Sequence, residues 1–193
     1  MRKFSLVLLL VSSMVIFGLL AAPVQAQPCF TMNTNGMTWN QLVDWLLPCA
    51  TGSAWEMNGD NNTFNTQSFD SSSVVQDVFD LNGTGNTINI MANSDWTGAA
   101  NGLVSAVGAN TVNVDTATVT ALAGDALRFL VGGNTVSVTN STLTGMGVAG
   151  DAIVAFGGSN SIDVIGSTLT GDDDGIDLEG PGDVVTIDTS TVT

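Results

Sequence analysis

The stretch NTVSVTNSTLTG at Asn134–Gly145 returns in closely similar form as NSIDVIGSTLTG at Asn160–Gly171. Each copy opens on asparagine, alternates apolar and polar residues, turns a polar corner and alternates again in TLT. Alternation of this kind over four or five residues predicts short β-strands. The two copies therefore predict a repeating unit that contains at least two strands.

The opening asparagine recurs at a nearly constant spacing, and this spacing predicts the fold. It stands at Asn62, Asn86, Asn110, Asn134 and Asn160, in steps of 24, 24, 24 and 26 residues. Another apolar run, such as DALRF at 125–129, begins nine residues before each asparagine from Asn86 onward. Three short strands in one such repeat fit one coil of a three-sided parallel β-helix, whose coils stack at about 4.8 Å. We predict an all-β, right-handed parallel β-helix over residues 62–193, with five to six coils.

Three motifs resemble the right-handed parallel β-helix repeat families, in particular the passenger regions of autotransporter-like bacterial surface proteins. They are the two stretches quoted above and GDAI at Gly150–Ile153, and the resemblance covers residues 62–193. It implies a non-enzymatic, adhesin-like scaffold that binds a protein or glycan through its flat faces. The last coil has no evident cap, so we expect either a longer parent protein or end-to-end stacking at the C-terminal coil.

The N-terminal 61 residues differ from the repeats. Residues 1–26 combine a basic start, an apolar run and a small-residue ending, which predicts a cleaved secretory signal peptide, with an uncleaved anchor as the alternative. We expect an exported chain, secreted or associated with the cell surface or outer membrane. Residues 27–61 are expected to cap the first coil with a helix that starts at Thr38 and Gln41, a capping-box pair. Export also favours a disulfide between Cys29 and Cys49.

The charge of the exported part excludes several partners. All 18 acids follow residue 26, where Arg128 is the only base, so the formal net charge there is −17. Such a surface repels nucleic acids and anionic lipid headgroups. We therefore expect no nucleic-acid partner and no membrane insertion of the mature chain, whereas association with cations is favoured.

The TLT-type runs supply the candidate binding face. The central apolar residue is expected to point into the core, and the two threonines to point outward and stack in columns. The columns comprise Thr118, Thr120, Thr142, Thr144, Thr168 and Thr170, with Thr191 and Thr193 in the last coil. Regular threonine arrays resemble those of β-helical ice-binding proteins, so ice is an alternative ligand. The alternative without a ligand is that threonine is present only because it is a favourable solvent-facing strand residue.

A second column is acidic. Asp125, Asp151 and Asp174 are expected to lie in successive coils, with Asp172 and Asp173 nearby. Stacked like charges repel, so each carboxylate needs either hydrogen bonds from turn amides or a bound Ca²⁺. The acidic loop at residues 172–174 is superficially similar to the aspartate motif of polygalacturonases. This similarity leaves a polysaccharide-cleaving enzyme as a further alternative. That family also uses histidine and lysine, which the exported part lacks.

The recurring asparagines Asn62, Asn86, Asn110, Asn134 and Asn160 are expected to play a structural part. Amides stacked in successive coils form hydrogen-bonded ladders and satisfy backbone groups at the corners. We therefore predict a structural ladder and no binding site at these positions.

Overall fold

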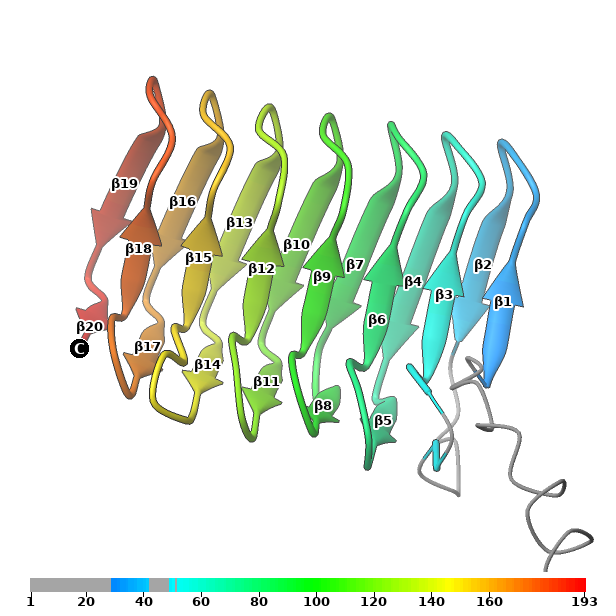
Figure 1. The fold of residues 1–193 in the computed structure, drawn as a ribbon, viewed down its shortest axis with the longest axis horizontal. Coiled ribbons are helices and arrows are strands. Elements are labelled where there is room, and N and C mark those ends of the chain that lie inside the picture. Colours follow the sequence, from blue (N-terminus) through cyan, green and yellow to red (C-terminus); the bar gives the residue numbers. More distant parts are fainter. Residues whose placement is uncertain (1–28, 42–48, 51) are drawn as a thin grey trace, which may run out of the picture.

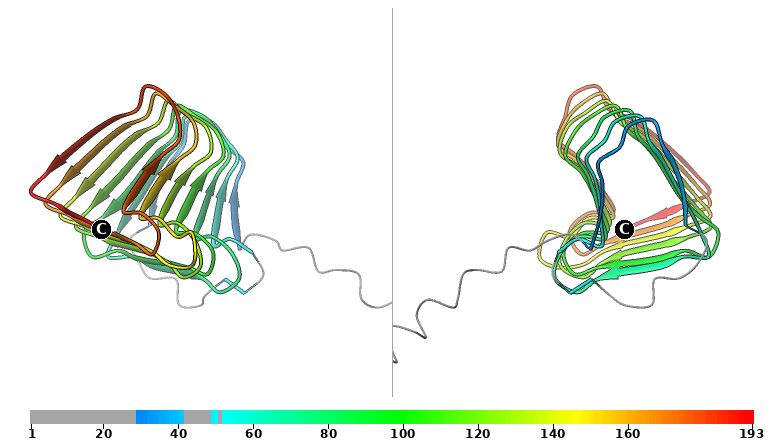
Figure 2. Two further views of the ribbon diagram at one scale, coloured as in Figure 1. Left: turned by 60° about the vertical axis from the view of Figure 1, so that its left-hand side comes forward. Right: turned by 90° about the vertical axis from the view of Figure 1, so that its right-hand side faces the viewer.

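The computed structural model describes residues 29–41, 49–50 and 52–193. Its 20 strands form three parallel sheets, and the chain passes from one sheet to the next in every coil (Figure 1). This is a parallel β-solenoid of about six turns, as the repeat spacing predicted. Viewed along its length, successive coils superimpose around three sides (Figure 2).

Sheets A and B take one strand from every described coil, and sheet C takes one from every coil after the first. Sheet A contains β1 (Phe30–Met32), β3 (Trp55–Met57), β6 (Phe79–Leu81), β9 (Leu103–Ser105), β12 (Leu127–Phe129), β15 (Ile153–Ala155) and β18 (Ile176–Leu178). Sheet B contains β2 (Thr38–Gln41), β4 (Thr63–Gln67), β7 (Thr87–Met91), β10 (Thr111–Asp115), β13 (Thr135–Thr139), β16 (Ser161–Ile165) and β19 (Val184–Asp188). Sheet C contains β5 (Asp70–Ser73), β8 (Asp95–Gly98), β11 (Thr118–Ala121), β14 (Thr142–Gly145), β17 (Thr168–Gly171) and β20 (Thr191–Val192).

The period-two pattern directs one set of side chains into a continuous core. Val136, Val138 and Leu143 are at most 1 % exposed, whereas the alternate residues Ser137 and Thr142 face outward. Aromatic residues fill the core in the N-terminal half, where Phe79 and Trp96 stack with ring centroids 5.7 Å apart. Burial of this apolar surface is the main force that holds the coils together.

Each coil turns two of its corners in the same way. The residue before each stacked asparagine has a positive φ, for example 67° at Gly85 and 60° at Ala109. The residue before the stacked position at the corner between sheets B and C also has a positive φ, for example 48° at Asn140 before Ser141. A left-handed residue bends the chain sharply from one sheet to the next, and the side chain that follows it is buried, as at Asn86, Asn110 and Ser141.

The N-terminal part corrects one prediction. Thr38–Gln41, expected to begin a capping helix, form strand β2, and Trp39 pairs in register with Phe64 of β4. The alternation of TWNQ matches the coil pattern, and pairing with β4 outweighs the local helix signal. The rest of the expected helix, residues 42–48, and the expected signal peptide lie outside the described residues. Strands β1–β3 precede Asn62, so the solenoid includes part of the segment expected to be only a cap.

The disulfide between Cys29 and Cys49 is confirmed, with Cα atoms 5.8 Å apart. It joins Cys29, the residue before β1, to Cys49, which pairs with Ser73 of the next coil, and so links the start of the first coil to its end. A disulfide is consistent with an oxidising, exported environment. Among the described residues, no helix is long and apolar enough to cross a membrane.

Candidate binding faces and polar columns

The outer face of sheet C carries the expected threonine columns. Thr118 pairs with Thr142, and Thr142 pairs with Thr168; Thr120, Thr144 and Thr170 align in the same way. These side chains are half-buried or exposed, whereas Val119, Leu143 and Leu169 between them are fully buried. The structure therefore brings all six candidate threonines onto one face.

The columns are longer than the TLT motif alone indicated. Thr97 aligns with Thr120 and extends one column, whereas Asp95 aligns with Thr118 and Asp70 with Asp95. At the other end, Thr191 aligns with Thr168. The face therefore changes from threonine to aspartate toward the N-terminal coils. The sequence signal for this change is SDWT at 94–97. Its tryptophan takes the inward place of leucine in TLT, so Asp95 and Thr97 take the two outward places.

Sheet B has a second regular outer face that the sequence analysis missed. Amide groups form a ladder there: Asn65 Nδ2 donates to Asn40 Oδ1, Asn89 Nδ2 to Asn65 Oδ1, and Asn113 Nδ2 to Asn89 Oδ1, at 2.6–2.7 Å. The second asparagine in NTINI and NTVNV, Asn89 and Asn113, is the sequence signal for this ladder.

The first asparagine of each motif forms the buried ladder. The backbone N–H of each donates to the Oδ1 atom of the next: Asn62 to Asn86, Asn86 to Asn110, Asn110 to Asn134 and Asn134 to Asn160, at 2.7–3.1 Å. All five residues are at most 2 % exposed. Their amides satisfy corner N–H groups that would otherwise be buried without a partner.

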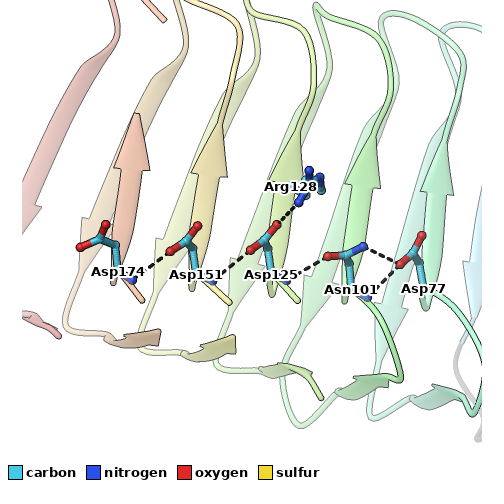
Figure 3. A network of polar contacts seen from close by, with 6 residues as sticks. All are labelled: Asp77, Asn101, Asp125, Arg128, Asp151 and Asp174. Atoms are coloured by element: carbon cyan, nitrogen blue, oxygen red, sulfur yellow. Dashed lines mark hydrogen bonds and ion pairs between the residues drawn. The ribbon is translucent and has the colours of Figure 1, made fainter. Parts of the chain in front are cut away.

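The acid column is organised by the same device (Figure 3). The N–H of Asn101 donates to Asp77, that of Asp125 to Asn101, that of Asp151 to Asp125 and that of Asp174 to Asp151, at 2.8–2.9 Å. The carboxylates of Asp77, Asp125 and Asp151 thus each accept a hydrogen bond from the backbone of the next coil, which offsets part of the repulsion between stacked charges.

Arg128 neutralises the most buried member of that column. Its Nη1 atom lies 2.6 Å from Asp125 Oδ2, and the Asp125 side chain is 1 % exposed. The guanidinium also lies over the ring of Phe156, 4.8 Å from its centroid. Arg128 is the only basic residue in the described part of the chain.

The structure brings together only three of the five acids that the sequence analysis named as a candidate calcium site. Oxygen atoms of Asp151, Asp173 and Asp174 lie within 4.8 Å of one another. Asp125 instead binds Arg128, and Asp172 Oδ2 accepts a hydrogen bond from the Gly147 N–H at 2.8 Å. Burial raises the pKa of Asp151, and its bond from the backbone of Asp174 opposes the rise. Calcium binding, like a catalytic part for the loop 172–174, stays a prediction.

A second acidic group, on the outer side of sheet A, was not anticipated. Asp80 lies between β3 and β9 and accepts a hydrogen bond from Ser53 Oγ at 2.6 Å. Burial raises the pKa of Asp80 from 3.8 to about 7; the bond from Ser53 opposes the rise, whereas Asp77 and Glu56 add to it. The acids at positions 56, 77 and 80 were visible in the sequence, but their proximity depends on the coil register.

This shift predicts a pH dependence. Between pH 4 and 7 the folded state holds a proton on Asp80 that the unfolded state releases, so stability rises as the pH falls from 8 toward 5. We expect Asp80→Asn to raise the free energy of unfolding at pH 8 by about 1 kcal/mol, after discounting for partial exposure. The asparagine amide can still accept from Ser53 and donate to Asp77.

Thermal melts at pH 5 and pH 8 measure this effect. Because lower pH also relieves the general repulsion between acids, the control is Asp188→Asn, which removes an exposed charge. The gain between pH 8 and pH 5 should shrink in Asp80→Asn and stay near the wild-type value in Asp188→Asn. Equal gains in both variants would show that Asp80 has an ordinary pKa.

The chain matches no protein-family model, no curated protein and no solved structure. The class that its geometry defines is the three-sheet parallel β-solenoid. Its function has to be inferred from its own surfaces.

Proposed function

We propose that this chain is an exported, non-enzymatic scaffold, a right-handed β-helix of the autotransporter-passenger type that binds a ligand through the outer face of sheet C. The observation that carries this proposal is the pair of threonine columns, held in register by β11, β14 and β17. Hydroxyl and methyl groups repeat there at the strand spacing, about 4.8 Å, on a backbone that is fixed on both sides by neighbouring coils.

The outer face of sheet C is better suited to ligand binding than to catalysis. Its outward groups are hydroxyls and methyls, and the strand backbone that carries them is fully paired within the sheet. Preorganised side chains on rigid strands lose little conformational entropy when a ligand binds. The threonine columns run in one direction over several coils and do not line a pocket. We therefore infer that the ligand is an extended protein, glycan or crystalline surface.

Ice is the second candidate ligand, and one observation favours it. Thr97 extends one threonine column by a coil beyond the TLT-type motifs, and Thr191 continues the other column in the last coil, as its TVT motif indicated. The result is a longer regular array than the motif itself indicated. On this alternative, the threonine methyl and hydroxyl groups would order water at the spacing of the coils.

End-to-end association is a further part of the proposal. The outer edges of β18, β19 and β20 have no neighbouring strand within residues 52–193, and the core residues Ile176, Leu178 and Val185 are only partly buried there. Edge strands of this kind are templates for pairing with another chain. A second copy of the chain, stacked on this end, would satisfy them.

One set of variants tests both ligand classes. Thr142→Tyr combined with Thr168→Tyr places two bulky rings on the sheet C face, and Thr87→Tyr places one on sheet B as a control. We expect the double variant to lose at least tenfold in affinity for the ligand that wild type captures from an array of glycans and extracellular matrix proteins. Thr87→Tyr should bind as wild type does.

The same proteins are examined for thermal hysteresis and for ice-crystal shape. Ice binding predicts hysteresis in wild type and in Thr87→Tyr, and its collapse in the double variant. Ligand capture that survives in the double variant, with a normal melting temperature, would contradict the assignment to sheet C.

A further inference from the structure

A row of exposed apolar side chains runs beside the threonine columns. Val74, Leu122 and Met146 are 55 %, 53 % and 38 % exposed, and Val75 and Val148 are 48 % and 103 % exposed. These five residues, which we call the apolar ridge, lie in the loops that leave sheet C for sheet A, along the lower edge in Figure 1. They contribute little to the core, because that space is filled by the inward residues of the strands.

Register aligns three ridge residues, Val74, Leu122 and Met146, in one column, in which Ala99 stands between Val74 and Leu122. Ala121 pairs with Gly145 and with Gly98, so the residues that follow, Leu122, Met146 and Ala99, are also neighbours. Backbone hydrogen bonds hold them there: Leu122 N–H donates to Gly98 O at 2.9 Å, and Met146 N–H donates to Ala121 O at 3.1 Å. Val74 takes the same place in the preceding coil, where Ala99 N–H donates to Ser73 O at 2.9 Å.

The ridge is therefore a third column on the sheet C side. Along β11 the side chains at 118 and 120 face outward and those at 119 and 121 inward, so Leu122 continues the outward set. A chain gains nothing in its own stability from holding large apolar groups in water, and a contiguous exposed patch of this kind marks an interaction surface.

Acids lie at both ends of this surface. Asp172 follows Gly171, which pairs with Gly145, and so takes the place of Met146 in the next coil, with Asp173 exposed beside it. Toward the N-terminal coils of the sheet C face, Asp70 and Asp95 occupy the column of Thr118, the threonine column farther from the ridge. In the described part of the chain the only base, Arg128, is already bound to Asp125.

From this arrangement we propose that the apolar ridge binds a basic amphipathic segment of a partner protein. The partner's apolar side chains cover Val74, Leu122, Met146 and Val148, and its lysines or arginines face the acids at the two ends. Opposite charge also speeds the encounter with a strongly acidic chain. The inference rests on the proposed function. The ridge borders the threonine face, and an apolar partner segment there would mean that the ligand of this face is a protein.

Charge also argues against two other occupants. A second copy would bring two strongly acidic surfaces together, and an anionic membrane would repel the same acids. Both nevertheless give distinct results in the experiment below.

The probe is a short synthetic amphipathic peptide of leucine and lysine, titrated against residues 27–193 by isothermal calorimetry. The comparison peptide replaces leucine by serine and keeps every lysine. Leu122→Asp and Val148→Ser alter the ridge at exposed positions, so the fold should persist, which a thermal melt checks. Val184→Asp, at an apolar residue 61 % exposed on sheet B, is the matched control.

We expect the leucine–lysine peptide to bind wild type and Val184→Asp, and to bind both ridge variants at least tenfold more weakly. The serine–lysine peptide should bind wild type as weakly as the leucine–lysine peptide binds the ridge variants. Equal affinity for the two peptides would overturn the proposal, because charge alone would then explain binding. Unchanged affinity in the ridge variants would also overturn it.

Two further results would assign the ridge to another occupant and so overturn the proposal. One is self-association in sedimentation that Leu122→Asp abolishes; the other is binding to phosphatidylcholine vesicles that Leu122→Asp abolishes. None of these outcomes depends on Thr142 or Thr168. If the ridge fails while Thr142→Tyr combined with Thr168→Tyr still abolishes ligand capture, the proposed function stands without this inference.

Discussion

Arg128→Met is expected to lower the free energy of unfolding by about 3 kcal/mol, because it leaves a buried carboxylate without its counter-charge. Asp125 is 1 % exposed, and Arg128 Nη1 lies 2.6 Å from its Oδ2 atom. The backbone N–H of Asp151 still donates to Asp125 Oδ1, but one hydrogen bond does not balance a buried negative charge. The contact between the guanidinium and Phe156 is also lost.

The acid column supplies its own control. Asn101 occupies the position of Asp125 one coil earlier, and its Oδ1 atom accepts the Asp125 N–H at 2.9 Å. Asp125→Asn therefore keeps the acceptor that the next coil needs and removes the charge. Combined with Arg128→Met, it should recover most of the lost stability in urea unfolding. A double variant as unstable as Arg128→Met would show that the arginine acts through packing and not through charge.

Asn110→Ala is expected to cost about 3 kcal/mol through its hydrogen bonds. The Oδ1 atom of Asn110 accepts the buried Asn86 N–H at 2.8 Å, and Nδ2 donates to Ser105 Oγ and Val107 O at 3.2 Å. Asn110 is 1 % exposed, so water does not replace these partners. Alanine also opens a small cavity at the corner.

Two controls separate the buried ladder from the loss of any asparagine. Asn113, three residues further on, donates from the more exposed ladder on sheet B, and Asn113→Ala should cost less than about 1 kcal/mol. The Nδ2 atom of Asn86 is buried and has no described partner, so Asn86→Ala should cost less than Asn110→Ala. Equal losses for all three variants in chemical denaturation would refute this order.

The repeat made most of the architecture predictable. Alternation in NTVSV and TLT placed Val136, Val138 and Leu143 in the core, and the constant spacing placed equivalent residues in register. The same spacing predicted which asparagines and acids would stack. The contacts of a solenoid can be predicted from its sequence, because each coil contacts mainly its neighbours and repeats their local interactions.

The errors arose where the pattern is local or weak. TWNQ satisfies a capping box when read alone, but pairing with β4 makes Thr38–Gln41 a strand. Asp80 shares a site with Glu56 and Ser53, which are 24 and 27 positions away, and only the coil register brings them together. The apolar ridge lies in loops of unequal length, so no short motif marks it.

The threonine columns on sheet C underlie the proposed ligand binding, and a cysteine pair tests them most directly. Thr120 and Thr144 are partners in register, and adjacent strands lie about 4.8 Å apart, within the range that a disulfide spans. Thr120→Cys with Thr144→Cys should cross-link in air, seen as a shift of the intact mass, without loss of the fold. Thr120→Cys with Thr142→Cys, displaced by two residues, should not. Cross-linking of the displaced pair, or failure of the aligned pair, would contradict the columns.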